Sequence, residues 1–265
     1  MQTLKLPGTE IEISRIGLGC MSLKGDITID QTIISTALGG GINFLDTADL
    51  YQKGLNEEIV GAAIAGKRKE VVLATKVGNE LNPDGEGWSW NPRKEYILKA
   101  VEKSLKRLQT DFIDLYQLHG GTIEDPLEET YEAFERLKTQ GKIRAFGISS
   151  IRPNVIRKVM QINSPATIMM QYSPLDRRPE ETVFPLLGKT TTRILVRGSF
   201  AKGLLIDKPE TEFLDFKPEQ VKEIRERIKS FGIKDKLVGT LRSDGGIALT
   251  IFGASFISSS GRPLV

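Results

Sequence analysis

The sequence has few of the residues from which proteins build disulfides and transition-metal sites. It contains one cysteine, Cys20, and one histidine, His119, among 265 residues. A single cysteine excludes disulfides within the chain and any cysteine-based zinc site, and with one imidazole a metal site would consist mostly of carboxylates. No such carboxylate cluster stands out. We therefore expect no metal, and the cysteine content fits a reducing compartment such as the cytoplasm.

Long apolar runs and blocks of one charge are also missing. No apolar run approaches the ~18 residues that a membrane-spanning helix needs, and the amino terminus lacks the apolar core of a signal peptide. The 37 basic and 34 acidic residues are interspersed, and the one dense basic run, 67–69, is followed at once by Glu70. This pattern predicts a cytoplasmic protein that binds neither membranes nor nucleic acids, and it leaves the oligomeric state open.

What the sequence does contain is a regular alternation of strand-like and helix-like segments. Strand-like runs begin near residues 16, 43, 71, 112, 145, 167, 194 and 247, and helix-like segments separate most of them. Alternating strands and helices favour a parallel sheet, and eight units in roughly 250 residues are typical of a (β/α)8 TIM barrel. Residues 4–13 predict an N-terminal β-hairpin, and Asn56 is expected to cap a helix. Residues 1–265 are therefore predicted to form one barrel domain.

Four ionisable side chains fall where three of these predicted strands end. Asp46 closes the second strand and Tyr51 follows it, while Lys76 and His119 close the third and fourth. Taken alone, each has an ordinary structural explanation as a packed histidine, an ion-pair partner or a loop anchor. The carboxyl ends of parallel barrel strands meet on one rim, where barrel enzymes build their active sites. The joint placement therefore predicts that the four side chains converge.

Motifs for other nucleotide-binding sites are missing. No G-x-G-x-x-G follows a predicted strand, so a Rossmann site has no support. The run 188–190 resembles the end of a Walker loop, but Val183 occupies the place of the required earlier glycine. The loop 78–92 contains both tryptophans, Trp88 and Trp90. Long loops with exposed aromatic residues commonly bind a ligand.

The sequence resembles the aldo-keto reductase superfamily from Leu4 to about Ser255. The resemblance rests on residues 41–48 together with Tyr51, on the Ala-Thr-Lys run that ends at Lys76, and on residues 114–119, which end in His119. It implies an enzyme that reduces aldehydes or ketones with hydride from NADP(H). Tyr51 would donate the proton, Lys76 would lower the tyrosine pKa from about 10, Asp46 would orient Lys76, and His119 would position the carbonyl oxygen.

The same resemblance assigns residues to the cofactor. Ser149, Ser150 and Gln171 stand where the family holds the nicotinamide carboxamide, with Ser150 in place of the usual asparagine, and Arg197 stands beneath the nicotinamide ring. The residues expected to contact the cofactor are Cys20, Met21, Asp46, Ser149, Ser150, Gln171, Arg197, Gly198, Ser199, Phe200, Lys202, Gly253 and Ser255.

The last residues depart from the family pattern. The Gln or Arg expected after the last strand falls on Ser260, with Arg262 as a candidate replacement, and the residues that clasp the adenosine would lie beyond Val265. We therefore expect a missing closing helix and weak NADP(H) binding with reduced preference over NAD(H). Two alternatives stay open: a cofactor-binding regulatory subunit, since potassium channel β subunits share this fold and these motifs, and a catalytically inactive truncated relative.

Overall fold

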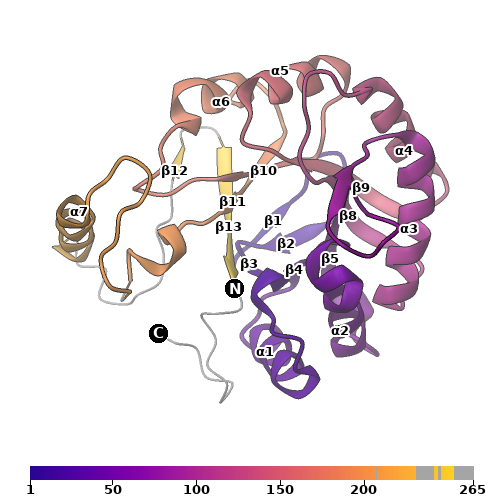
Figure 1. Ribbon diagram of the computed structural model, residues 1–265, viewed down its shortest axis with the longest axis horizontal. Helices are drawn as coiled ribbons and strands as arrows, with labels where there is room; N and C mark the ends of the chain where they lie inside the picture. The colour runs from indigo at the N-terminus through magenta and orange to yellow at the C-terminus, as the bar shows by residue number, and fades with distance from the viewer. Residues whose placement is uncertain (207, 231–241, 244–245, 254–265) are drawn as a thin grey trace.

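In the computed structural model, which describes residues 1–206, 208–230, 242–243 and 246–253, eight parallel strands occupy the centre of the molecule (Figure 1). They are β3 (Ile16–Gly19), β4 (Phe44–Asp46), β5 (Val72–Val77), β8 (Ile113–Leu118), β9 (Ile143–Ser149), β10 (Thr167–Gln171), β11 (Arg193–Arg197) and β13 (Gly246–Gly253). The sheet closes because β13 pairs in parallel with both β11 and β3. The predicted (β/α)8 barrel is confirmed, and every predicted strand start lies within two residues of the observed one.

Helices follow the strands and pack on the outer face of the barrel, where α1 to α6 curve around it in Figure 1. A largely buried apolar stripe on each of α3 and α4 faces the strands, as the helical spacing requires. The helices are α1 (Ile27–Gly39), α2 (Leu55–Ala63), α3 (Lys94–Leu108), α4 (Leu127–Thr139), α5 (Pro153–Ile162), α6 (Pro179–Leu187) and α7 (Pro218–Ser230), with short 3-10 turns η1 (Cys20–Ser22), η2 (Tyr51–Gly54), η3 (Arg68–Glu70) and η4 (Ala201–Gly203). None of the helices in these described ranges is long and apolar enough to cross a membrane.

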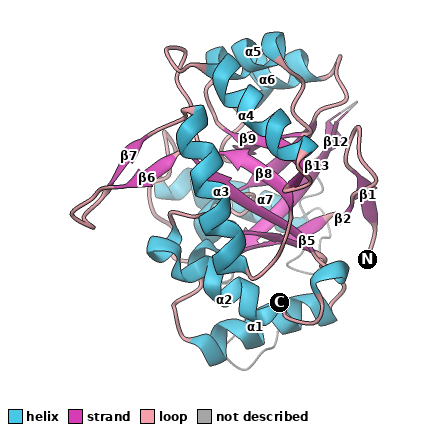
Figure 2. Cartoon of the chain, turned by 90° about the vertical axis from the view of Figure 1, so that its right-hand side faces the viewer, coloured by secondary structure: helices cyan, strands magenta, loops and turns pink. Residues whose placement is uncertain are grey.

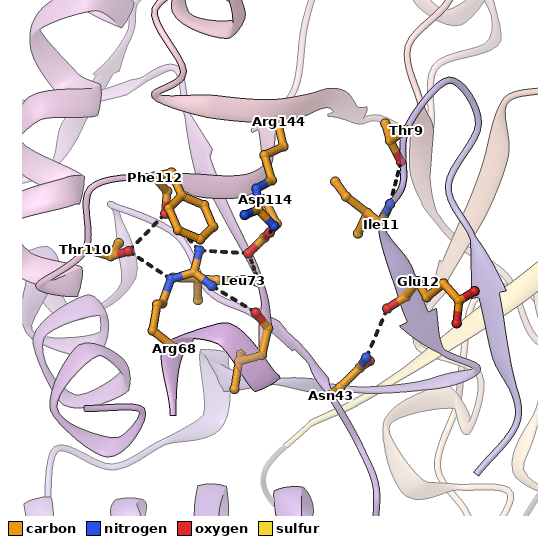
Figure 3. Close-up of polar contacts among 11 residues, drawn as sticks. Thr9, Ile11, Glu12, Asn43, Arg68, Leu73, Thr110, Phe112, Asp114 and Arg144 are labelled. Atoms are coloured by element: carbon orange, nitrogen blue, oxygen red, sulfur yellow. Dashed lines mark hydrogen bonds and ion pairs between the residues drawn. The ribbon is translucent and has the colours of Figure 1, made fainter. Parts of the chain in front are cut away.

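The predicted N-terminal hairpin, β1 (Thr3–Lys5) and β2 (Glu12–Ser14), covers the end of the barrel where the strands begin. Its apolar residues Leu6, Ile11 and Ile13 pack with the side chains that fill the barrel interior. Asn43, just before β4, fixes the hairpin by accepting from the Ser14 N–H (2.6 Å) and donating to the Glu12 carbonyl (3.0 Å), the latter contact being drawn in Figure 3. The hairpin therefore leaves only the opposite end of the barrel available for a site.

That opposite end bears the loops that follow the strands, including a second hairpin that the sequence had suggested only as a loop. It consists of β6 (Asn79–Leu81) and β7 (Trp88–Trp90), which pair antiparallel. Figure 2 shows this hairpin and the β1–β2 hairpin projecting from opposite sides of the molecule. Our expectation that the closing helix is missing refers to residues 254–265, which lie outside the described residues. The same holds for Ser255, Ser260 and Arg262.

A buried carboxylate links the strands near their amino-terminal ends (Figure 3). Asp114 on β8 accepts hydrogen bonds from Arg68 (2.7 Å), from the Leu73 backbone N–H (3.0 Å) and from Arg144 (2.9 Å). Both guanidinium groups also lie 4.0 Å from the centre of the Phe112 ring. In the basic run 67–69, Lys67 and Lys69 are exposed, whereas the side chain of Arg68 is only 16% exposed.

We expect Asp114→Ala to lower the free energy of unfolding by about 3 kcal/mol, because it leaves two guanidinium groups and a buried N–H without their common acceptor. Urea unfolding followed by circular dichroism measures this loss. Asp111→Ala, which removes an exposed carboxylate three residues earlier, is the control and should change stability by less than about 0.5 kcal/mol. Equal stability of the two variants would show that the Asp114 network does not hold the strands together.

Candidate active site

The four side chains that the sequence singled out lie together at the carboxyl ends of β4, β5 and β8. Asp46 is the last residue of β4, Lys76 lies near the end of β5, His119 follows β8, and Tyr51 begins η2. The Lys76 Nζ atom lies 2.6 Å from Asp46 Oδ2 and 3.4 Å from the Tyr51 hydroxyl. The ring centroids of Tyr51 and His119 are 5.9 Å apart in an edge-to-face arrangement. We refer to these four residues as the tetrad.

The Lys76 ammonium is buried, with 1% of the residue exposed, and each of its three protons has an acceptor. The third acceptor, besides Asp46 and Tyr51, is the Thr47 carbonyl oxygen at 2.6 Å. Burial is the largest single influence and disfavours the charged form, but the attraction and hydrogen bonds of Asp46 and Tyr51 together hold the pKa of Lys76 above its usual value. Gln117 donates to the other Asp46 oxygen (3.2 Å) and so fixes the carboxylate plane. The lysine therefore presents a permanent positive charge to the tyrosine.

The pKa of Tyr51 corrects one expectation. We expected Lys76 to lower the Tyr51 pKa below its usual value, and Lys76 does act in that direction. Burial of the phenol has the larger effect and raises the pKa, and the charge of Asp46 adds to the rise. The sequence could not give this sign, because the depth of burial follows from how the loops after the strands pack. At neutral pH the phenol is therefore protonated and able to donate.

His119 is held in its neutral form. Burial, together with the charges of Lys76 and Arg197, lowers its pKa to about 3. Its backbone N–H donates to the Val77 carbonyl (2.8 Å), whereas its Nδ1 atom is buried without a hydrogen-bond partner among the described residues. A neutral imidazole has one donor and one acceptor nitrogen, so His119 can donate a hydrogen bond without bringing charge to the site.

Sequence reasoning missed the buried polar residues behind the tetrad. Asn56, expected to cap α2, instead accepts from the Thr47 hydroxyl (2.6 Å) and donates to the Cys20 carbonyl (2.8 Å), while Gly54 occupies the cap position. Glu57 is completely buried and accepts from the Thr75 hydroxyl (2.6 Å) next to Lys76. These residues tie the loops after β3 and β4 to β5. In the sequence, these two residues could have been recognised only as polar residues on the side of the helix whose other residues are apolar or glycine.

The expected cofactor residues lie at adjacent strand ends. Gln171 ends β10 and Arg197 ends β11, where the Arg197 guanidinium donates to the Gln171 amide oxygen (3.3 Å). Ser149 ends β9, and Ser150 follows it with its side-chain oxygen accepting from the Arg152 N–H (3.2 Å). Thus the residues that we expected to hold the carboxamide and to lie beneath the nicotinamide ring are close together on one side of the rim.

The remaining expected cofactor residues differ in how far they are exposed. Gly198, Ser199, Phe200 and Lys202 form the turn after β11, and Gly198 takes a positive φ of 70° that favours glycine. The Ser199 hydroxyl is buried without a partner among the described residues. Cys20 is fully buried, so only Met21 of that pair presents its side chain. Gly253, the last residue of β13, pairs with Gly19 of β3, and Ser255 lies outside the described residues.

The two tryptophans of the β6–β7 hairpin have different environments. The Trp90 indole N–H donates to both oxygens of Asp125 (3.0 and 3.1 Å), which also accepts from the Thr122 hydroxyl and N–H. The Trp90 ring lies against Gly78 and Gly120, where a Cβ on Gly78 would come within 2.6 Å of the ring. Trp88 is 52% exposed. Trp90 therefore fixes the backbone just beyond Lys76 and His119, and Trp88 remains available at the surface.

Comparison with known proteins identifies relatives along almost the whole chain. A model of the aldo/keto reductase family matches residues 15–245. The uncharacterized oxidoreductase YqkF of Bacillus subtilis is 46% identical, covering 97% of this chain and 88% of that protein. The aldo-keto reductase yakc of Schizosaccharomyces pombe, whose name specifies NADP(+), is 34% identical over 80% of this chain and 67% of its own length.

The fold comparison agrees with the sequence comparison. The holo form of aldo-keto reductase AKR11C1 from Bacillus halodurans superimposes with a TM-score of 0.85 at 45% identity, covering 96% of this chain and 86% of that one. Among the described residues of this chain, no group of three or more His, Cys, Asp or Glu side chains is arranged to hold a metal ion.

One carboxyl group behind the site is buried with only partial compensation from Arg107, Lys76 and a backbone hydrogen bond from Leu50. Asp49 follows the Asp46–Ala48 segment, is 7% exposed, and has a buried Oδ1 without a hydrogen-bond partner in the described structure. Burial and the nearby negative charge of Glu57 raise its pKa to about 7. The folded protein therefore keeps this proton up to about pH 7, whereas the unfolded chain releases it near its ordinary pKa of 3.8.

Since the folded state binds the proton more tightly, the contribution of Asp49 to stability should fall as pH rises from about 4 to about 7. The side chain that Asp49→Asn introduces stays neutral at every pH. We therefore expect the variant's free energy of unfolding to equal the parent's near pH 4 and to be higher at pH 8 by an amount on the order of a few kcal/mol. Urea unfolding across this pH range, with Asp111→Asn as the control, measures the difference. Parallel stability curves for parent and Asp49→Asn would contradict the prediction.

Proposed function

The chain belongs to the aldo/keto reductase family, and from this premise we propose that it reduces aldehydes or ketones to alcohols with hydride from NADPH and a proton from Tyr51. The observation that supports this most is the contact between the Tyr51 hydroxyl and a Lys76 ammonium that Asp46 holds charged. A fixed cation beside a phenol stabilises the phenolate that remains after the phenol has given up its proton. We further propose a cytoplasmic location, in keeping with the single cysteine.

The residues present fit a nicotinamide cofactor. The Gln171 amide lies at the end of β10, and the Ser199 hydroxyl, which has no partner in the described structure, lies in the turn after β11. Both are groups that could bond a carboxamide or a phosphate. The exposed Arg197 and Lys202 side chains add positive charge for an anionic ligand. The choice of NADP(H) rests on the resemblance of the motifs and on the NADP(+) that the name of the Schizosaccharomyces pombe relative specifies.

The reduction needs hydride at the carbonyl carbon and a proton at the carbonyl oxygen. The bound cofactor supplies the hydride. Neutral His119 donates a hydrogen bond to the carbonyl oxygen and so stabilises the negative charge that develops there. Tyr51 then transfers its phenolic proton to that oxygen, and the Lys76 ammonium stabilises the resulting phenolate. Asp46 keeps the ammonium charged and oriented throughout.

We expect Tyr51→Phe to lower kcat by roughly 10²- to 10⁴-fold, because the proton donor is lost while the ring remains. The dissociation constant for NADPH, measured by quenching of protein fluorescence, should change less than about twofold, since the phenolic oxygen is the only atom removed. Tyr96→Phe is the matched control, because the Tyr96 hydroxyl donates to the Asn79 carbonyl away from the tetrad. Similar turnover by Tyr51→Phe and by the control would remove Tyr51 from the mechanism.

A further inference from the structure

The amide of Gln171 is oriented by a buried carboxylate on the segment that follows β10. Gln171 Nε2 donates to Asp176 Oδ2 at 2.9 Å, and Asp176 is only 2% exposed. Arg178 makes two hydrogen bonds to the same carboxylate, each 2.8 Å long. Burial works against the charge on Asp176, but the hydrogen bonds from Arg178 and Gln171 hold its pKa below the usual value. Asp176 is therefore an ionised carboxylate that can only accept hydrogen bonds.

The charge on Asp176 decides which way the Gln171 amide faces. The nitrogen and oxygen of a glutamine amide have nearly the same shape, so their assignment depends on the partners. Because the Asp176 carboxylate has no proton to donate, the NH2 group must face it and the oxygen must face away. The oxygen accepts from Arg197 at 3.3 Å, and an amide oxygen with two lone pairs can accept one more hydrogen bond.

The backbone around Asp176 is also fixed. Asp176 and Ser173 exchange backbone hydrogen bonds of 3.2 and 3.0 Å, which close a tight turn directly after β10. On the other side, Gly198 lies against Gln171, since a Cβ on this glycine would lie 3.4 Å from Gln171 Cγ. The side chain is thus confined between the turn and the end of β11, and it is unable to exchange its two amide ends without breaking the bond to Asp176.

We propose that Asp176 is a positioning residue that fixes the oxygen of Gln171 toward the cofactor site, so that the site selects a pyridine ring whose substituent carries an N–H donor. The inference rests on the proposed function, which places a nicotinamide carboxamide beside Gln171. A ring with an acetyl group in place of the carboxamide would leave the Gln171 oxygen facing a methyl group. An amide free to turn could adapt to either ring.

Isothermal titration calorimetry with three oxidised cofactors tests this selection directly. The probes are NADP+, its thionicotinamide analogue, which keeps the NH2 group, and its 3-acetylpyridine analogue, which replaces NH2 by methyl. Binding of oxidised forms does not depend on their reduction potentials. We expect the first two to bind the parent protein with similar affinity and the acetyl analogue to bind roughly tenfold more weakly, as expected for one lost hydrogen bond that leaves a lone pair of the Gln171 oxygen without a donor.

In Asp176→Asn the preference for the carboxamide over the acetyl ring should fall severalfold, because an asparagine can present either a donor or an acceptor to Gln171. Glu180→Gln is the matched control. It neutralises a carboxylate four residues along, which bonds Tyr172 and Arg177 rather than Gln171, and the preference should stay at the parent value.

If Asp176→Asn does not fold, Gln171→Met decides the question, since it removes the oriented oxygen and should lower the same preference. Equal affinity of the parent protein for NADP+ and for the acetyl analogue would overturn the inference and leave the proposed function intact. A preference that persists in Gln171→Met or in folded Asp176→Asn would also overturn it. If the parent binds none of the three cofactors, the proposed function and the inference both fail.

Discussion

The buried ion pair between Lys76 and Asp46 is the interaction on which the rest of the site depends. A buried ammonium is tolerated only when its protons have acceptors, and removing one partner of such a pair commonly costs 3–5 kcal/mol. Lys76 meets this requirement with Asp46, the Thr47 carbonyl and the Tyr51 hydroxyl. Satisfying the charge therefore fixes the ends of β4 and β5 and brings the tyrosine to the ammonium. The contact that stabilises this part of the fold also prepares the chemistry that we propose.

The same charge determines the protonation of its neighbours. His119 remains neutral because burial and the nearby cations oppose a second positive charge, and Tyr51 remains protonated because burial outweighs the attraction of Lys76. At neutral pH the site thus offers a neutral imidazole and a protonated phenol beside a fixed cation. Both neutral groups can donate hydrogen bonds to one carbonyl oxygen. This combination suits a reduction in which negative charge develops on that oxygen.

The sequence predicted the barrel and the convergence of the tetrad because both follow from short-range patterns. Strand and helix periodicity located all eight strands, and the rule that parallel strands end on one rim placed Asp46, Lys76 and His119 together.

The sequence did not predict contacts between side chains distant in the chain. Asn56 resembled a helix cap but bonds the loop after β3 instead, and Trp90 donates to Asp125 on another loop. Nor could it predict the sign of the Tyr51 pKa shift, which depends on burial. Asp176 lies close to a strand end, so the rule that identified Asp46 could have drawn attention to it.

The account is tested most directly by mixing the purified protein with NADPH and a panel of aldehydes and ketones while following the cofactor absorbance. If the chain is a carbonyl reductase, absorbance falls with at least one carbonyl compound, and one alcohol forms for each NADPH consumed. If calorimetry shows that NADPH binds but no carbonyl compound in the panel is reduced, the result contradicts the proposed reduction, and a regulatory subunit or a catalytically inactive relative replaces the enzyme.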